Sequence, residues 1–268
     1  MLNTIGFLGC GNMGGAIARA VCKAADPQNV WLANRTAAKA ETLAAELGCN
    51  TTINDEVAGR CDLIFLAVKP QMMEELLAPL RFTLAERPSR FVLCSMAAGL
   101  SIARIQEMAG GDCPVIRIMP NTPASVGAGM IQYCTSNVTA EEEAEFLKLM
   151  APAGRLDAVP EGLIDAASCV SGCGPAWVYQ FIEALADGGV ACGLPRAKAQ
   201  EYAAQMVLGS AKLVLESGQH PGALKDAVCS PGGSTIQGVR VLEEKGLRGA
   251  VMDAVIASYN KTKEMGKG

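Results

Sequence analysis

The chain has a single histidine, His220, among its 268 residues. A site that needs two or three imidazoles, such as most histidine-rich zinc and non-haem iron centres, is therefore excluded. Cysteine is more abundant, with 11 residues, but the number is odd and no C-x-x-C motif occurs. We therefore expect reduced thiols that pack as small hydrophobic side chains, with no disulfide framework and no metal.

The sequence also lacks an excess of basic charge. Lysine and arginine total 23 against 27 aspartates and glutamates, which gives a net charge of −4, and like charges never occur five in a row. Proteins that neutralise phosphate backbones carry a basic stripe, so nucleic acid is not an expected partner.

Long hydrophobic runs are absent as well. No window approaches the ~18–20 uninterrupted apolar residues that a membrane-spanning helix needs. The N-terminus leads directly into an apolar strand, without a basic segment or a small-residue cleavage site. We expect a cytoplasmic protein without membrane association.

Half of the residues are hydrophobic, and the length predicts about two domains. Over residues 1–160, short apolar runs alternate with stretches of helical periodicity, which is typical of an α/β fold whose parallel sheet is covered on both faces. The predicted strands are Thr4–Leu8, Val30–Ala33, Asp62–Val68, Arg90–Ser95, Val115–Met119, Gly129–Thr135 and Leu156–Val159. The predicted helices are Asn12–Lys23, Thr36–Leu47, Gln71–Leu80, Ser101–Met108 and one that opens at Thr139 with a capping box to Glu142.

Residues 161–268 have a different texture, with long helical stretches rich in alanine, glycine and leucine. The predicted helices are Trp177–Val190, Pro195–Glu216, Leu224–Val228, Thr235–Glu244 and Leu247–Thr262. Several are small or apolar on more than one face, and a half-chain of this size has little interior in which to bury them. We therefore expect a large subunit interface and a homodimer. The alternative is that these helices bury only against one another.

The first predicted strand ends in a glycine-rich turn, Gly9-Cys10-Gly11-Asn12-Met13-Gly14, which opens the first predicted helix. Gly9 would allow the tight turn, Gly11 the close approach of a pyrophosphate, and Gly14 the close packing of helix on strand. The helix N-terminus would then offer free N–H groups to the phosphates. In this strand–turn–helix context the motif predicts dinucleotide binding.

The end of the second predicted strand indicates which dinucleotide is bound. An NAD-binding chain places Asp or Glu about 20 residues beyond the glycines, whereas this chain has Asn34-Arg35-Thr36. A guanidinium can pair with a 2′-phosphate, and two short polar side chains can hydrogen-bond it. We predict NADPH as the cofactor, with NADH possible. The alternatives are that Arg35 is an ordinary surface cation and that Thr36 only caps the next helix.

Two later strand ends point to the same crevice, because ligands of open α/β sheets bind outside the carboxyl ends of the strands. One strand leaves through Ala67-Val68-Lys69-Pro70, and the next through small residues that leave room for a ring. Lys69 could serve as a catalytic acid, although a solvated loop lysine is the commoner outcome. His220 lies in a Gln-His-Pro-Gly turn, where a capping or surface role is favoured.

In the helical half, Ser230-Pro231-Gly232-Gly233-Ser234-Thr235 leads into a helix. Two glycines and neighbouring hydroxyls before a helix start can bring successive N–H groups onto a carboxylate. We predict a substrate site here; the alternative is a plain helix cap with a flexible lead-in.

Together with Arg117–Pro123 and Ser171-Gly172-Cys173-Gly174-Pro175-Ala176, these motifs resemble those of the pyrroline-5-carboxylate reductase family, and the resemblance covers nearly the whole chain. It implies an N-terminal Rossmann dinucleotide-binding domain, residues 1–160, followed by an all-helical dimerisation and substrate-binding domain, residues 161–268. It also implies reduction of the cyclic imine L-1-pyrroline-5-carboxylate to L-proline with NAD(P)H, the last step of proline biosynthesis. A homodimer, or a higher oligomer of dimers, would build each pocket from two chains.

The resemblance also implies roles for individual residues. Thr235 is the expected catalytic residue, placed at the imine nitrogen. The expected substrate-binding residues are Glu161, Gly232, Gly233, Ser234 and Thr235. The expected cofactor-binding residues are Gly9, Cys10, Gly11, Asn12, Met13, Gly14, Asn34, Arg35, Thr36, Asn54, Ala67, Val68, Lys69, Pro70, Met96, Ala97 and Ala98.

Two other functions compete with this one. A β-hydroxyacid dehydrogenase shares the glycine-rich opening and a helical second half, but needs a lysine on the helix after its middle glycine-rich motif, and Trp177–Ala186 contains none. An NADP-binding regulator without turnover would carry the same cofactor motif but would not consume NADPH.

Overall fold

The computed structural model describes residues 2–265. The chain divides into two compact units, the first formed by Met1–Cys173 with Ser258–Gly268 and the second by Gly174–Ala257. The first unit extends past residue 160 because a helix that begins at Glu161 packs on its sheet. The domain boundary at residues 160/161 therefore differs from the division by contacts, and it stays a prediction.

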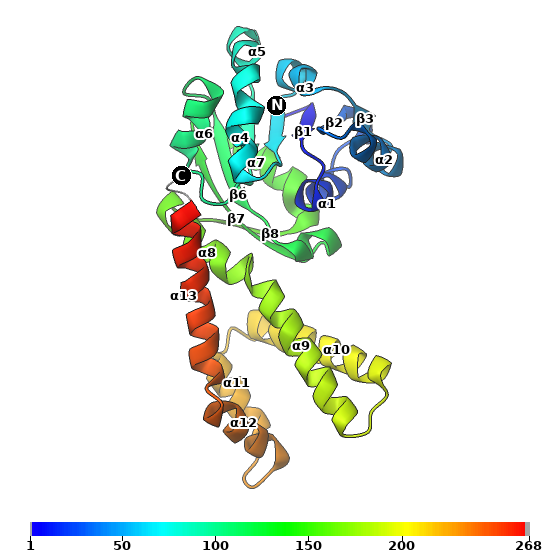
Figure 1. Ribbon diagram of the computed structural model, residues 1–268, viewed down its shortest axis with the longest axis vertical. Helices are drawn as coiled ribbons and strands as arrows, with labels where there is room; N and C mark the ends of the chain where they lie inside the picture. The colour runs from blue at the N-terminus through cyan, green and yellow to red at the C-terminus, as the bar shows by residue number, and fades with distance from the viewer. Residues whose placement is uncertain (1, 266–268) are drawn as a thin grey trace. The chain divides into compact units, whose positions relative to one another are not determined.

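The first unit is built on one eight-stranded sheet (Figure 1). Its strands are β1 (Ile5–Leu8), β2 (Val30–Ala33), β3 (Asn50–Thr51), β4 (Leu63–Leu66), β5 (Val92–Ser95), β6 (Val115–Met119), β7 (Gly129–Ser136) and β8 (Gly154–Ala158). They lie in the order β3-β2-β1-β4-β5-β6-β7-β8, and every pair is parallel except β6–β7. The predicted α/β class is confirmed, and the two-residue strand β3 was not predicted.

Strand β7 reverses direction because its connection to β6 is short. A parallel crossover needs a dozen or more residues, usually with a helix. Here only the turn η4 (Thr122–Val126) and a few flanking residues separate Met119 from Gly129, so β7 runs antiparallel to β6. The next connection carries a helix, and β8 is again parallel to β7.

Helices cover both faces of the sheet. In the first unit they are α1 (Asn12–Val21), α2 (Ala37–Leu47), α3 (Asn54–Arg60), α4 (Met73–Leu77), α5 (Arg81–Glu86), α6 (Ile102–Ala109), α7 (Ala140–Met150) and α8 (Glu161–Ser171). Successive strand residues belong to different cores: Phe7 lies in the cluster with α1, α2 and α7, and Leu8 in the cluster with α3 to α6. Phe7 also stacks on Phe65, with ring centroids 4.5 Å apart. The central strands β1, β4, β5 and β6 are thus buried on both sides, as predicted.

Two local predictions have different outcomes. The helix predicted over residues 71–80 is divided into η2 (Pro70–Met72), α4 and η3 (Ala78–Leu80), because Pro79 has no N–H to donate within a helix. The capping box at Thr139 is confirmed: its side chain accepts from the Glu142 N–H, and the Glu142 carboxylate accepts from the Thr139 N–H. Helices α3, α5 and α8 were not predicted.

The second unit is helical throughout its regular structure. It contains α9 (Gly174–Ala191), α10 (Arg196–Ser217), α11 (Pro221–Val228), α12 (Ser234–Glu244) and most of α13 (Leu247–Met265). Helices α9 and α10 approach closely, since a Cβ on Gly189 would lie 3.2 Å from the Ala199 Cβ. His220 caps α11, where its Nδ1 accepts from the Gly222 N–H at 3.0 Å, as favoured from the sequence.

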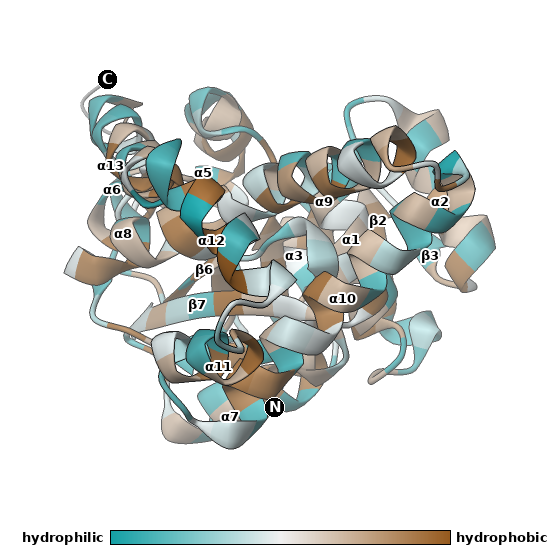
Figure 2. Cartoon of the chain, turned by 90° about the horizontal axis from the view of Figure 1, so that it is seen from below, coloured by the Kyte–Doolittle hydropathy of each residue, from teal (hydrophilic) through white to brown (hydrophobic). Residues whose placement is uncertain are grey.

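Many large apolar side chains of these helices are exposed. Figure 2 shows hydrophobic segments, coloured brown, on α10, α11 and α12. The exposed side chains include Tyr202, Met206, Leu208, Leu213, Leu215, Val228, Val241, Leu242, Val251, Met252 and Ile256. The buried hydrophobic residues described within this unit are three alanines, Ala186, Ala199 and Ala203. The helices therefore bury little among themselves, which favours the predicted subunit interface over the alternative.

The described part of the chain has two further properties. Between residues 2 and 265, no helix combines the length and apolarity that a membrane crossing requires. All 11 cysteines are free thiols, and burial raises the pKa of Cys61 to about 12.

Candidate cofactor and substrate sites

The glycines of the turn after β1 differ in how much space a side chain would have at each position. Gly9 has φ +113°, and a Cβ there would lie 2.5 Å from the Ala67 carbonyl oxygen. A Cβ on Gly14 would lie 2.5 Å from the Gly9 carbonyl oxygen and 2.8 Å from the Ala67 Cβ. Beside Gly11, by contrast, no atom among the described residues lies within 4 Å of the Cβ position. The turn is thus closed at Gly9 and Gly14 and open at Gly11, as phosphate binding requires.

Helix α1 begins at the open glycine. Its N-cap is Gly11, which offers no side-chain cap, and the first helical hydrogen bond runs from the Gly15 N–H to the Gly11 carbonyl at 2.8 Å. The N–H groups of Asn12, Met13 and Gly14 precede that bond, so they have no partner inside the helix. Free N–H groups and the positive end of the helix dipole suit the pyrophosphate of a dinucleotide.

The side chain of Asn34 joins the end of β2 to this turn. Its Oδ1 accepts from the Cys10 N–H at 3.0 Å, and its Nδ2 donates to the Thr36 carbonyl at 2.9 Å. Asn34 therefore fixes the shape of the turn as well as lying beside it. Arg35 next to it is exposed and forms no ion pair with the described residues.

Arg35 lines a cavity of about 380 Å³, together with Asn34, Glu41, Ile53 and Asn54 among others. The Ile53 side chain is 65% exposed, although it is large and apolar. A polar rim with an apolar wall suits a nucleoside, and Ile53 was not among the predicted site residues. Its signal in the sequence is weak, because the short strand that precedes it is polar.

The segments after β4 and β5 lie beside each other. Strand β4 pairs with β1 on one side and β5 on the other, so Leu66 lies between Leu8 and Ser95. The residues Ala67–Pro70 and Met96–Ala98 follow these strands at the same edge of the sheet, next to the glycine-rich turn. Lys69 is exposed, while Ala97 is buried. The structure therefore brings the predicted cofactor residues of the three strand ends together.

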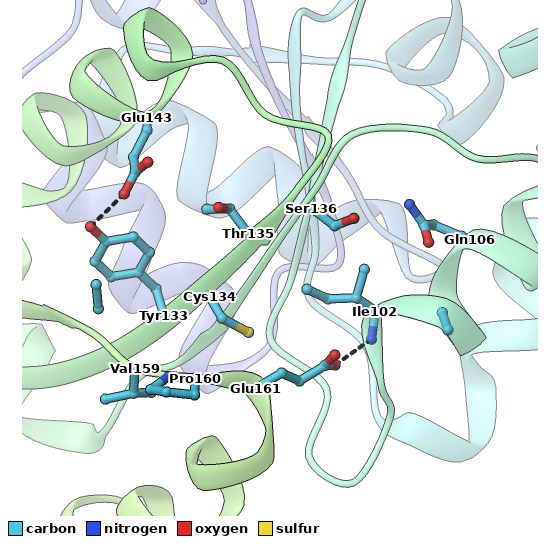
Figure 3. Close-up of a pocket in the computed structure, with 12 residues that line it drawn as sticks. Ile102, Gln106, Tyr133, Cys134, Thr135, Ser136, Glu143, Val159, Pro160 and Glu161 are labelled. Carbon is cyan, nitrogen blue, oxygen red and sulfur yellow. Dashed lines mark hydrogen bonds between the residues drawn. The ribbon is translucent and has the colours of Figure 1, made fainter.

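Glu161 lies in a shallow cavity of about 600 Å³ that is lined by residues of the first unit (Figure 3). Its Oε1 accepts from the Ile102 N–H at 2.6 Å, which caps α6, and lies 3.5 Å from Arg117 Nη1. Burial raises the pKa of Cys134 in this cavity to about 11. Burial and a hydrogen bond to Glu143 raise the pKa of Tyr133 to about 12. Neither of these two groups is suited to acid–base work near neutral pH.

The predicted substrate loop precedes α12 in the second unit. Gly232 has φ +70°, and a Cβ on Gly233 would lie 2.5 Å from Ser230 Oγ. The Gly233 N–H donates to the Ser230 carbonyl at 3.0 Å, so this donor is used within the turn. Helix α12 has no side-chain cap, which leaves the N–H groups of Ser234 and Thr235 without an intrahelical partner. Both side chains are exposed beside them, so the loop offers N–H groups and hydroxyls to an anion.

Comparison with known proteins gives consistent matches along the whole chain. Residues 161–265 match a family model described as pyrroline-5-carboxylate reductase dimerisation, and residues 4–99 match one described as NADP oxidoreductase, coenzyme F420-dependent. The pyrroline-5-carboxylate reductase of Escherichia coli (strain K12) is 43% identical over 271 residues, which cover 100% of both chains. That of Arabidopsis thaliana is 38% identical over 265 residues, covering 97% of this chain and 95% of the relative. A solved Plasmodium falciparum pyrroline carboxylate reductase with NADP bound is 35% identical, with a TM-score of 0.89 over 99% of both chains.

Proposed function

The chain belongs to the pyrroline-5-carboxylate reductase family, and on that premise we propose that it reduces L-1-pyrroline-5-carboxylate to L-proline with NAD(P)H. It is an NAD(P)H-dependent oxidoreductase with an N-terminal Rossmann-like domain and a helical dimerisation domain. The observation that carries the proposal is the 43% identity over the full length of a pyrroline-5-carboxylate reductase, which spans both the cofactor turn and the substrate loop.

The cofactor is a nicotinamide dinucleotide, and we propose that NADPH is preferred. The segment directly after β2, Asn34–Thr36, has no carboxylate that would repel a 2′-phosphate, and the Arg35 guanidinium is exposed beside the proposed nucleoside cavity, which Glu41 of α2 also lines. The turn from Gly9 to Gly14 would hold the pyrophosphate, and the segments Ala67–Pro70 and Met96–Ala98 would contact the nicotinamide half. When bound, the cofactor supplies the hydride.

The substrate loop would hold the carboxylate and the imine nitrogen. The N–H groups at the start of α12 and the Ser234 hydroxyl suit the carboxylate, because they are unpaired donors at a helix N-terminus. The Thr235 hydroxyl would hydrogen-bond the imine nitrogen or hand it a proton. A protonated imine is already electrophilic at carbon, so the main task of these residues is to orient it.

The role of Glu161 toward the substrate stays a prediction. Its Oε1 already binds the Ile102 N–H, so only the other carboxylate oxygen is left for a further contact. We also propose a homodimer, or a higher oligomer of dimers, located in the cytoplasm. The match to a dimerisation family model and the exposed apolar side chains of the helical unit support the dimer.

A single assay tests the reaction. The purified protein is mixed with NADPH and pyrroline-5-carboxylate, NADPH absorbance is followed, and the product is identified as proline by mass spectrometry. We expect decay of NADPH that depends on the substrate and equals the proline formed. NADPH binding without any such decay would instead favour a regulator that binds the cofactor without turnover.

A further inference from the structure

Helix α8 is joined to the sheet by buried polar contacts that the proposed reaction does not use. The residues involved are Arg117 in the middle of β6, Asn121 just after β6, and Gln132 on β7; their exposed fractions are 2%, 7% and 4%. Burying polar side chains costs free energy unless they are hydrogen-bonded, so each of these contacts constrains the position of α8.

Asn121 binds the last residue of α8. Its Nδ2 donates to the Ser171 carbonyl at 2.9 Å, and its Oδ1 accepts from the Met130 N–H at 3.0 Å. The last carbonyls of a helix have no partner within it, so the side chain of Asn121 completes the end of α8 from outside. The Ser171 hydroxyl in turn donates to Gln132 Oε1 at 2.8 Å. One helix end is thereby tied to β7 and to the loop that leaves the cofactor edge of β6.

This helix end lies where the chain leaves the first unit, which extends to Cys173 before the second unit begins at Gly174. The chain returns to the first unit at Ser258, and this return is also attached to α8. Thr262 Oγ1 lies 3.8 Å from Cys169 Sγ, and Lys263 Nζ lies 3.8 Å from Asp165 Oδ2. Asp165 accepts from Arg117 Nη2 at 2.5 Å. The segments at which the chain leaves the first unit and returns to it therefore both contact α8.

We infer that Asn121 is a positioning residue for the reduction, acting through the end of α8 rather than by touching the substrate. The inference rests on the proposed function, in which the cofactor is held by the first unit and the substrate loop belongs to the second. Without this hydrogen bond, the last turn of α8, from which the chain continues toward the substrate loop, would be held less precisely. Misplacement of reactants by about 1 Å can cost about 10²-fold in rate. Cofactor binding needs only the first unit and is unaffected.

The test compares Asn121→Ala, Ser171→Ala and the double variant with the unmodified protein. We expect Asn121→Ala to lower kcat by about 10- to 100-fold while the Kd for NADPH, measured by fluorescence titration, stays within about twofold. Ser171→Ala removes the bond to Gln132 and a weaker one to the Ala167 carbonyl within α8, but keeps the bond from Asn121, so it should have a smaller effect in the same direction. Because both changes free the same helix end, their effects on kcat should not add in the double variant. Amide hydrogen exchange over residues 165–173 should speed up in each.

Ser125→Ala is the matched control. Its hydroxyl donates to the Thr122 carbonyl at 2.9 Å in the same turn but does not contact α8, so its kcat should stay unchanged. An Asn121→Ala variant with normal kcat overturns the inference. The inference is also overturned if Asn121→Ala raises only the KM for pyrroline-5-carboxylate and leaves hydrogen exchange unchanged, because that result would indicate direct contact with the substrate. If Asn121→Ala does not fold, Ser171→Ala takes its place in the test. Normal kcat and normal hydrogen exchange in Ser171→Ala would then refute the inference. An unmodified protein without turnover refutes the proposed function instead.

Discussion

Adding one methyl group at Gly14 or at Gly11 should have opposite consequences for stability and for cofactor binding. At Gly14 the new Cβ would lie 2.5 Å from the Gly9 carbonyl oxygen, which belongs to the backbone and cannot rotate away. At Gly11 no described atom lies within 4 Å of the same position. The two alanine variants therefore separate the packing role of the glycine-rich turn from its binding role.

The magnitudes follow from these contacts. Overpacking at Gly14 costs about 1–3 kcal/mol, and the better helix propensity of alanine returns about 1 kcal/mol. The net loss of up to about 2 kcal/mol lowers Tm by about 2–4 °C per kcal/mol in a chain of this size. At Gly11, the helix N-cap, alanine costs about 1 kcal/mol or less. A methyl group in the space for the pyrophosphate should weaken NADPH binding by about tenfold or more, which is about 1.4 kcal/mol or more.

Thermal unfolding without cofactor and fluorescence titration with NADPH measure the two quantities independently. Gly11→Ala should lower Tm by no more than about 2–4 °C and lose affinity for NADPH, whereas the effect of Gly14→Ala should be mainly a loss of Tm. If Gly11→Ala binds NADPH as tightly as the unmodified protein, the pyrophosphate does not approach this glycine and the assignment of the turn is wrong.

Three further changes test other residues. Arg35→Asp should weaken NADPH binding by about tenfold or more and leave NADH binding unchanged; retained NADPH affinity would contradict the role of Arg35. Thr235→Ala should lower kcat/KM by about 10²-fold, and an unchanged value would remove Thr235 from the mechanism. The hydrogen bond from Arg90 lowers the pKa of Glu142 in the folded state. The pair therefore stabilises the fold fully above the usual glutamate pKa of about 4.3. This stabilisation is lost as pH falls through the lowered pKa of the folded state. Arg90→Gln should therefore reduce stability by about 1 kcal/mol or less at pH 7 and not in strong acid, as Tm measurements across pH would show.

The elements predicted from the sequence are those with a strong local signal. Strands β2 and β6 begin and end at the predicted residues, because the apolar run of β2 lies between two asparagines and the mostly apolar β6 lies between Pro114 and Pro120. The start of the helix after Thr139 was predicted from its capping box. The steric roles of Gly9 and Gly14 in the turn also followed from the sequence, since each depends on local backbone geometry, whereas the approach of a pyrophosphate to Gly11 stays a prediction.

What the sequence could not predict depends on distant partners. Strand β3 has two polar residues and exists because it pairs with β2. Helix α8 shows an exposed Leu163 and Val170 beside a buried Ile164, an irregular pattern that is explained only by its packing on β7. The contact of Asn121 with Ser171 joins residues 50 positions apart. No local propensity specifies which strand end will complete a given helix.

The scarcity of histidine is consistent with how this chain is proposed to promote the reaction. Its one imidazole is occupied as the cap of α11, and the buried arginine of the first unit, Arg117, is engaged by the carboxylates of α8. The proposed substrate loop offers backbone N–H groups and hydroxyls, which would hold a carboxylate without titrating near neutral pH. Hydride transfer to an iminium carbon asks mainly for alignment, which can supply up to ~7–11 kcal/mol of the barrier. Alignment is then worth more than any one acid or base, and the inferred role of Asn121 at the end of α8 is to contribute to it.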